Sequence, residues 1–410
     1  MKPRLWIPPI PLVAGILFQV LAWCFVLVHA VFPSFGIELA WVHAVALGWL
    51  TVVALAVLLH VVPGFTDLVW RAEGVARGTV LVVCAAALAL VLSFAASAPT
   101  GVAFAGIVLA AAIILYAALA MWTLSGPSPD RRSATIARGL GMAVAALALT
   151  ALLGGQLSLG YAWSDARLLA GAPSHAVLGI AAWLTMLATG VSSRTFRPLL
   201  GAQSRWPKAH VISGGSLLVG SILAAATAPW SLDLFRAGLI IASAGVLAYV
   251  IDAADILRRA QTPHRAARAF VIASIVWLTT ATALALAASW GAPVGRAAIV
   301  VALAGWLGQM VNAHLHHLGI RVVATYILGA EDETRPWTLL VPAWSWAALV
   351  TAQVAVLCTA LRALGAPATF AWLGGGAGLL CMLAILANAA HAVRSARTFN
   401  QRATPTSSEA

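Results

Sequence analysis

The chain has 410 residues, of which 62% are hydrophobic and only 9% are charged. Soluble domains carry about 25% charged residues and about 45–50% apolar ones, so a water-soluble fold of this size could not hide so much apolar surface. The composition excludes a soluble enzyme, a nucleic-acid-binding module and a secreted disulfide scaffold, and it makes the lipid bilayer the expected solvent. The net charge of +12 is then expected to mark orientation rather than an anionic partner.

Twelve apolar segments are long enough to cross a bilayer as helices. A membrane-spanning helix needs about 20 mostly apolar residues, and cutting the chain at clusters of charge, Pro and Gly leaves twelve such stretches. We therefore predict an all-α polytopic membrane protein, with one transmembrane domain over residues 1–397 and a disordered cytoplasmic tail over 398–410. The predicted spans lie near residues 9–32, 37–62, 75–97, 101–124, 135–160, 171–191, 210–228, 234–256, 269–290, 297–320, 338–361 and 368–392.

The Lys and Arg residues fall almost entirely on one face of this predicted arrangement. Twenty of the 24 lie at the two ends of the chain and in the connections after even-numbered spans; the others are Arg167, Arg236, Arg296 and Arg362. Positive residues in short loops stay cytoplasmic, so we expect both termini in the cytoplasm of a bacterial-type inner membrane. Tryptophans near the predicted membrane edges, such as Trp41, are expected to anchor the chain at the headgroup level.

Histidine is the titratable residue that is common inside the predicted spans, whereas the acidic residues, including Asp252, are assigned almost entirely to loops. An imidazole in hydrocarbon needs a hydrogen-bond partner or a metal, so this set points to metal or haem ligation. The alternative for each residue is packing between helices with a bond to a neighbouring carbonyl. The histidines in predicted spans are His29, His43, His60, His175, His314, His316, His317 and His391.

Three of the spans share a sequence pattern. Residues 43–51 read HAVALGWLT, residues 175–185 read HAVLGIAAWLT, and residues 305–308 read GWLG. The shared tryptophans, about four helices apart each time, predict three diverged four-helix units near residues 1–130, 131–257 and 258–397. Chance similarity in a composition so rich in Ala, Leu and Gly is the alternative. The aligned tryptophans are Trp49, Trp183 and Trp306.

Aligning these tryptophans places the histidines in two layers. At about 1.5 Å per residue, His43 and His60 are about 25 Å apart along one helix, too far for a single metal ion or haem iron. We therefore expect two sites. The outer candidates, for haem or for a metal, are His43 and His175 with His29; the inner candidates are His60, His314, His316 and His317.

Polar residues near these histidines could orient the imidazole rings. Gln309 and Asn312 precede His314 by about one turn or less and are candidates for that role, although ordinary interhelical hydrogen bonding explains them equally well. Arg194 and Arg321 could pair with haem propionates or lipid phosphates, and a role in setting topology explains them equally well.

Twelve helices with histidines on the second, sixth and tenth resemble the haem-copper oxidase subunit I superfamily, and two segments resemble its NnrS relatives. Residues 41–66 are similar to that family's WHAHEM stretch ending in VPxxT, and residues 175–194 to its later HA helix. The resemblance implies haem b as cofactor, with copper as an additional metal. Carried over from subunit I, His43 and His316 would hold a low-spin haem and His314 a high-spin haem.

The chain also departs from these families. The paired histidines that would complete a copper site on the seventh span are absent, because that span offers only His210 at its edge. Val42 and Ala44 flank His43 where the NnrS pattern has HAHE. These differences argue against a complete oxidase or nitric oxide reductase centre.

The sequence therefore predicts a membrane protein that binds haem, with or without copper, of the respiratory or nitric-oxide-stress type. A respiratory electron donor and a small gas, nitric oxide or oxygen, are the expected partners, and no catalytic residue is assigned. One alternative is a transporter of a metal ion or small solute that uses the same histidines as transient ligands. Another is a membrane assembly factor without a cofactor.

Overall fold

The computed structural model describes residues 9–321 and 336–403 and confirms the all-α polytopic architecture. No strand occurs in this part of the chain, because a backbone in hydrocarbon must satisfy its own hydrogen bonds and an open sheet edge cannot. Twelve described helices are long and apolar enough to cross a bilayer: Ile10–Val31, Phe35–Thr66, Glu73–Ala95, Pro99–Leu124, Ser133–Trp163, Ala166–Leu200, Lys208–Thr227, Leu232–Arg258, Arg265–Ser289, Gly295–His317, Pro342–Ala363 and Thr369–Thr398.

Most spans are single α-helices, whereas the second, sixth and tenth are interrupted. The continuous helices are α1 (Pro9–Val31), α4 (Glu73–Ala95), α5 (Pro99–Leu124), α6 (Arg131–Trp163), α10 (Pro207–Thr227), α11 (Leu232–Arg258), α12 (Arg265–Ser289), α16 (Pro342–Ala363) and α17 (Thr369–Ala403). A short 3₁₀ helix, η6 (Pro336–Leu339), precedes α16.

The interrupted spans combine α-helical and π-helical segments. The second span consists of α2 (Phe35–His43), η1 (Ala44–Thr51) and α3 (Val52–Thr66). The sixth consists of α7 (Ala166–Leu169), α8 (Ala172–Val177), η2 (Leu178–Thr185) and α9 (Met186–Leu200). The tenth consists of α13 (Gly295–Val300), η3 (Val301–Leu307), α14 (Gly308–His314) and η4 (Leu315–Gly319).

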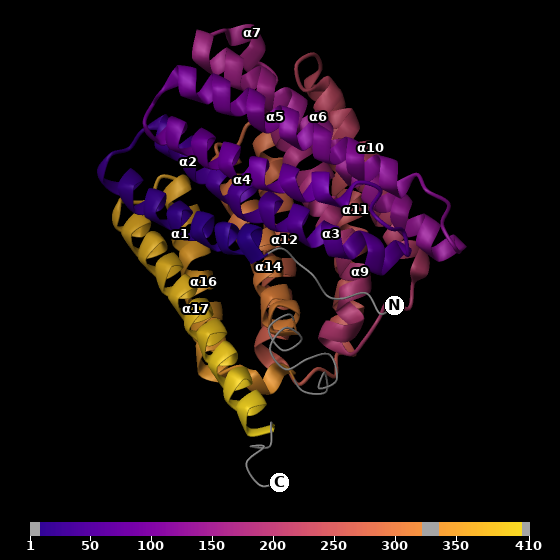
Figure 1. The fold of residues 1–410 in the computed structure, drawn as a ribbon. Helices are drawn as coiled ribbons and strands as arrows, with labels where there is room; N and C mark the ends of the chain where they lie inside the picture. The colour runs from indigo at the N-terminus through magenta and orange to yellow at the C-terminus, as the bar shows by residue number, and fades with distance from the viewer. Residues whose placement is uncertain (1–8, 322–335, 404–410) are drawn as a thin grey trace.

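The continuous helices surround the interrupted ones. The helices α4, α5 and α6 pack in sequence, as do α10, α11 and α12, and α16 packs on α17. Helix α1 then lies against α17, so that the two ends of the chain close the bundle (Figure 1). The second and tenth spans are the most deeply buried of the twelve: 72% and 78% of the residues in their apolar stretches are buried inside the protein.

Glycine allows α1 and α17 to approach closely. A Cβ atom added at Gly375 would lie 2.6 Å from the side chain of Leu27, and one at Gly378 would lie 2.1 Å from that of Trp23. Small residues permit such close packing between membrane helices, where lipid supplies no hydrophobic driving force.

Two predicted boundaries are wrong. Helix α17 continues to Ala403, so residues 398–403 are helical and not disordered. No Pro or Gly occurs between residue 398 and Pro405 to end the helix earlier. Residues 404–410 lie outside the described chain. The sixth span extends well past residue 191, to Leu200, where Gly201 ends the helix in a left-handed conformation (φ +71°). Arg194 therefore belongs to helix α9.

Candidate functional site

The π-helical segments of the described chain all lie in the second, sixth and tenth spans, beside the histidines. Segment η1 begins directly after His43, η2 begins three residues after His175, and η4 contains His316 and His317. A π-helical turn is rare and occurs mostly as a short insertion at a functional site. The irregular backbone therefore marks the same three spans that the sequence pattern singled out.

Two tryptophans link these spans by matching hydrogen bonds. The indole Nε1 of Trp183 donates to the hydroxyl of Thr51 at 3.1 Å, and the indole Nε1 of Trp306 donates to the hydroxyl of Thr185 at 3.1 Å. In each pair the threonine lies two residues after the tryptophan of its own span. The second span is thus bonded to the sixth, and the sixth to the tenth.

Trp49, Trp183 and Trp306 form a closed set of contacts between the second, sixth and tenth spans, called the tryptophan ring below. Its third contact uses glycine in place of threonine. Gly308 lies two residues after Trp306, and a Cβ atom added there would stand 3.0 Å from Cζ3 of Trp49. The three indoles are at most 2% exposed. The ring relates the three spans to one another in the way expected for diverged repeats, although the four-helix repeat itself stays a prediction.

His43 and His175 come together within the bundle. Their ring centroids are 6.5 Å apart and their planes are inclined by 23°. The Nδ1–H of His43 donates to the carbonyl of Leu39 at 2.8 Å, and the Nδ1–H of His175 donates to the carbonyl of Thr150 at 3.0 Å. Within the described residues neither Nε2 forms a hydrogen bond. Metal-bound histidines are usually oriented in this way, by a carbonyl on the nitrogen that does not bind the metal.

The surroundings of this pair are apolar and close-packed. The ring of Phe94 lies 5.0 Å from that of His43, and Tyr161 meets Phe94 edge-on at 5.4 Å. A Cβ atom added at Gly154 would lie 3.1 Å from Cε1 of His175. The 6.5 Å between the ring centroids is close to the about 6 Å expected for two imidazoles that share one metal ion through bonds of about 2 Å.

His29 does not join this outer pair. It lines a separate cavity of about 230 Å³ together with Glu38, Arg296 and Arg362. In residues 9–321 and 336–403, no group of three or more His, Cys, Asp or Glu side chains is arranged to hold a metal ion. The structure therefore brings together two of the three predicted outer residues.

His314 already has partners for both ring nitrogens. Its Nδ1–H donates to the carbonyl of Met310 at 2.8 Å, and its Nε2 accepts a hydrogen bond from the hydroxyl of Thr195 at 2.7 Å. No lone pair is left for a metal in this arrangement. His316 donates from Nδ1 to the carbonyl of Asn312 at 2.8 Å, and its ring packs on Phe270 with centroids 5.1 Å apart.

His264 joins the inner layer, which the sequence did not predict. This residue precedes α12, and its ring meets that of His317 edge-on, with centroids 5.9 Å apart. Burial, followed by the nearby His316 and Arg321, lowers the pKa of His264 to about 4. The buried Nε2 of His317 has no hydrogen-bond partner among the described residues. Because His264 lies in a connecting segment, the sequence gave no signal that it would join the inner layer.

The other predicted inner ligand, His60, does not contact these residues. His60 is half-buried in α3 and forms no hydrogen bond or ring contact in the described chain. The inner layer therefore consists of His314, His316 and His317 with His264; among the described residues Nε2 of His317 has no hydrogen-bond partner and only Nδ1 of His316 is bonded.

The residues expected to orient the imidazoles do so differently from the prediction. Gln309 and Asn312 are 1% and 4% exposed, and their side-chain oxygens have no partner within the described chain. Asn312 orients His316 through its main-chain carbonyl instead. Arg321 lies near His264 and His317, whereas Arg194 lies half-buried in α9.

Asp252 is buried inside helix α11, so its assignment to a loop is wrong. Its side chain is 1% exposed, accepts a hydrogen bond from the hydroxyl of Ser204 at 2.6 Å and lies 3.4 Å from Nε2 of His210. Helix α11 continues six residues beyond it, to Arg258. A carboxylate buried in this way is costly unless it is paired, and the partners come from a different part of the chain.

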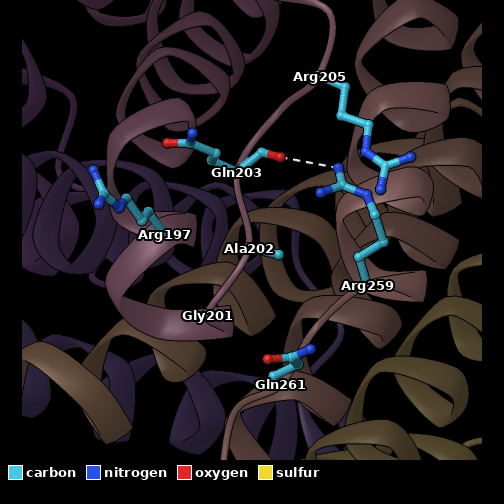
Figure 2. A pocket seen from close by; sticks show the side chains of 7 residues that line it. All are labelled: Arg197, Gly201, Ala202, Gln203, Arg205, Arg259 and Gln261. Carbon is cyan, nitrogen blue, oxygen red and sulfur yellow. Dashed lines mark hydrogen bonds between the residues drawn. The ribbon is translucent and has the colours of Figure 1, made fainter.

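A further cavity, of about 480 Å³, lies where α9 ends (Figure 2). Its lining includes Arg197, Arg205 and Arg259, of which Arg259 donates to the carbonyl of Gln203 at 2.9 Å and pairs with Asp255. These arginines belong to the face that carries most of the positive charge, so a role in setting topology accounts for them.

Comparison with known proteins adds no family to this description. No protein-family model matches the chain, and no curated protein is significantly similar to it in sequence. Function must therefore be argued from the site itself.

Proposed function

We propose that the protein binds haem within the bilayer and that His43 and His175 supply its imidazole ligands. The observation that supports this proposal is the outer pair itself: two rings from different spans, 6.5 Å apart, each held by a backbone carbonyl and each with an unused Nε2. Unpaired nitrogens inside a membrane protein are costly, and intramembrane histidines accordingly tend to be functional. A bound haem would supply electron transfer or gas binding.

The residues around the pair would position the ligands and keep out water. The carbonyls of Leu39 and Thr150 fix the tautomer of each ring and raise the basicity of its Nε2. Phe94 covers the ring of His43. In this proposal the haem would pass on electrons from a respiratory carrier, nitric oxide or oxygen would bind only if one of the two imidazoles left the iron, and copper would be an additional metal. The charge asymmetry of the sequence favours a bacterial inner membrane with both termini in the cytoplasm.

Visible spectroscopy tests the proposal. The full-length protein, purified in detergent, is compared in the oxidised and dithionite-reduced states with metal analysis of the same sample. We expect a reduced-haem band in wild type that weakens in His43→Ala and in His175→Ala. His391→Ala is the matched control, because His391 bonds only Ser395 at an exposed position of α17. A folded wild-type protein without colour or metal contradicts the proposal.

A second variant set separates the two histidine layers. Because both nitrogens of His314 are already bonded, His314→Ala should keep the haem band if only the outer pair binds haem. Loss of the band in His314→Ala but not in His43→Ala would assign the haem to the inner layer instead. A spectral shift on adding carbon monoxide or nitric oxide would indicate an iron with an open position.

The buried pair of Asp252 and His210 favours a second candidate, a transporter. A carboxylate and an imidazole 3.4 Å apart inside a span can relay a proton, as in coupled carriers. The test is uptake of Zn²⁺ into proteoliposomes that carry an internal zinc-sensitive dye. Uptake by a colourless wild-type protein, abolished in Asp252→Asn, would support the transporter, whereas a red protein without uptake would support haem binding.

A further inference from the structure

A cavity of about 230 Å³ opens on the side of the bundle where α1 and α16 end and α2, α13 and α17 begin. Its lining contains both polar and apolar side chains. Phe25, Val26 and Ile37 are among the apolar ones. The polar ones are His29, Glu38, Trp41, Arg296, Thr359 and Arg362. None of these residues belongs to the proposed haem pair.

Four polar atoms of this lining are buried and have no hydrogen-bond partner in the described chain. They are Nδ1 of His29, Nε1 of Trp41, Oγ1 of Thr359 and Nε of Arg362. Trp41 is 6% exposed and Thr359 is 8% exposed, so Trp41 is not the exposed membrane anchor that its position in the sequence predicts. The Nε1 of indole and the Nε of guanidinium can only donate, and buried polar groups in proteins are nearly always paired.

The charges of the lining also do not balance. Glu38 pairs with Arg296, with Oε1 and Nε 3.2 Å apart. Arg362 has no carboxylate partner in the described chain; it donates only to the carbonyl of Ala366, at 3.0 Å, and its Nε is unused. One positive charge is therefore left over beside several unused donors. An anion with acceptor oxygens complements both features.

We propose that this cavity binds a small organic carboxylate from the side of the membrane on which it opens. The carboxylate oxygens accept hydrogen bonds from Arg362 and Trp41, and the short apolar body lies against Phe25 and Ile37. The cavity sets the size limit, because 230 Å³ corresponds to about eight water molecules of about 30 Å³ each. The proposal goes beyond haem binding and depends on none of its ligands.

Calorimetric titration of the purified full-length protein with benzoate tests the proposal, with benzamide as an uncharged probe of the same shape. We expect saturable binding of benzoate and at least tenfold weaker binding of benzamide. Arg362→Gln should weaken benzoate binding at least tenfold, and Trp41→Phe, which keeps an aromatic ring but removes the N–H donor, should weaken it several-fold.

Arg236→Gln is the matched control. Arg236 lies on the same side of the bundle, pairs with Asp233 at 3.3 Å and stands over the ring of Trp290 at 5.5 Å, but it does not line the cavity. Benzoate affinity should be unchanged in this variant.

Three results would overturn the proposal. One is the absence of benzoate binding to wild type at millimolar concentration. Another is equal affinity of wild type and Arg362→Gln for benzoate. If Arg362→Gln does not fold, Trp41→Phe decides: unchanged benzoate affinity together with equally tight benzamide binding would show that no carboxylate site exists. Because the haem spectrum does not involve Arg362, failure of this proposal is distinguishable from failure of haem binding.

Discussion

Replacing Thr51 by valine tests the tryptophan ring that joins the second, sixth and tenth spans. The Thr51 hydroxyl accepts the hydrogen bond of the Trp183 indole at 3.1 Å and donates to the carbonyl of Ala46 at 2.8 Å. Thr51 is 2% exposed and Trp183 is 1% exposed. Thr51→Val keeps the size of the side chain but leaves the indole N–H buried without an acceptor.

The expected loss of stability follows from these two bonds. A buried donor left without a partner costs about 1–3 kcal/mol, whereas side-chain hydrogen bonds between membrane helices average about 0.6 kcal/mol and reach about 1.7 kcal/mol. Because both side chains are buried, we expect the free energy of unfolding to fall by about 1–2 kcal/mol. This change corresponds to a 5- to 30-fold larger unfolding equilibrium constant, on the order given for such differences.

Unfolding in mixed detergent micelles, followed by circular dichroism, measures this change. The double variant Thr51→Val with Trp183→Phe should be destabilised by less than the sum of the two single variants, because both remove the same bond. Thr280→Val is the control, since the Thr280 hydroxyl bonds only the carbonyl of Val276 at an exposed site and should shift stability by at most about 0.5 kcal/mol.

The reasoning is refuted if Thr51→Val destabilises the protein no more than Thr280→Val does. It is also refuted if the effects of Thr51→Val and Trp183→Phe simply add, because additivity would mean that the two side chains do not interact.

Two further predictions use the same unfolding assay. Gly308→Ala should destabilise by about 1–3 kcal/mol, since the new Cβ would stand 3.0 Å from Trp49, whereas Gly376→Ala, with nothing within 4 Å, should not; equal effects would contradict the close contact. His264, with its pKa lowered from 6.5 to about 4, should make unfolding easier as the pH falls from about 6.5 to about 4, because the unfolded chain binds a proton there that the folded chain does not. His264→Gln should flatten this dependence, and an unchanged slope would show that another group causes it.

The spans could be predicted because the bilayer imposes a composition on any helix that crosses it. About 20 apolar residues between charged or helix-breaking ones are enough to locate a span, and this signal is local in sequence. The shared Trp-Leu pattern singled out the second, sixth and tenth spans, which the structure joins through Trp49, Trp183 and Trp306; that they are diverged repeats stays a prediction. The π-helical segments were not predicted, since no residue type specifies them.

The candidate site was less predictable, because it depends on which helices become neighbours. Trp41 and Trp230 both sit at predicted membrane edges, yet Trp230 is 83% exposed and Trp41 is 6% exposed. The burial of Asp252 could not be predicted, because its partners, Ser204 and His210, lie more than 40 residues earlier in the chain. Likewise, His43 contacts His175 but not His29. Only the packing of the helices determines which of these histidines become neighbours.

The contact between α1 and α17 has a consequence for how the protein is made. Leu27 and Trp23 emerge from the ribosome long before their glycine-rich partner surface around Gly375, which follows more than 300 residues later in the sequence. At about 5–20 residues per second, roughly 340 residues of intervening chain take on the order of 20–70 s to translate. For that interval α1 waits in the membrane with one side facing lipid or a chaperone, because its contact with α17 can form only after Gly375 and Gly378 have been synthesised.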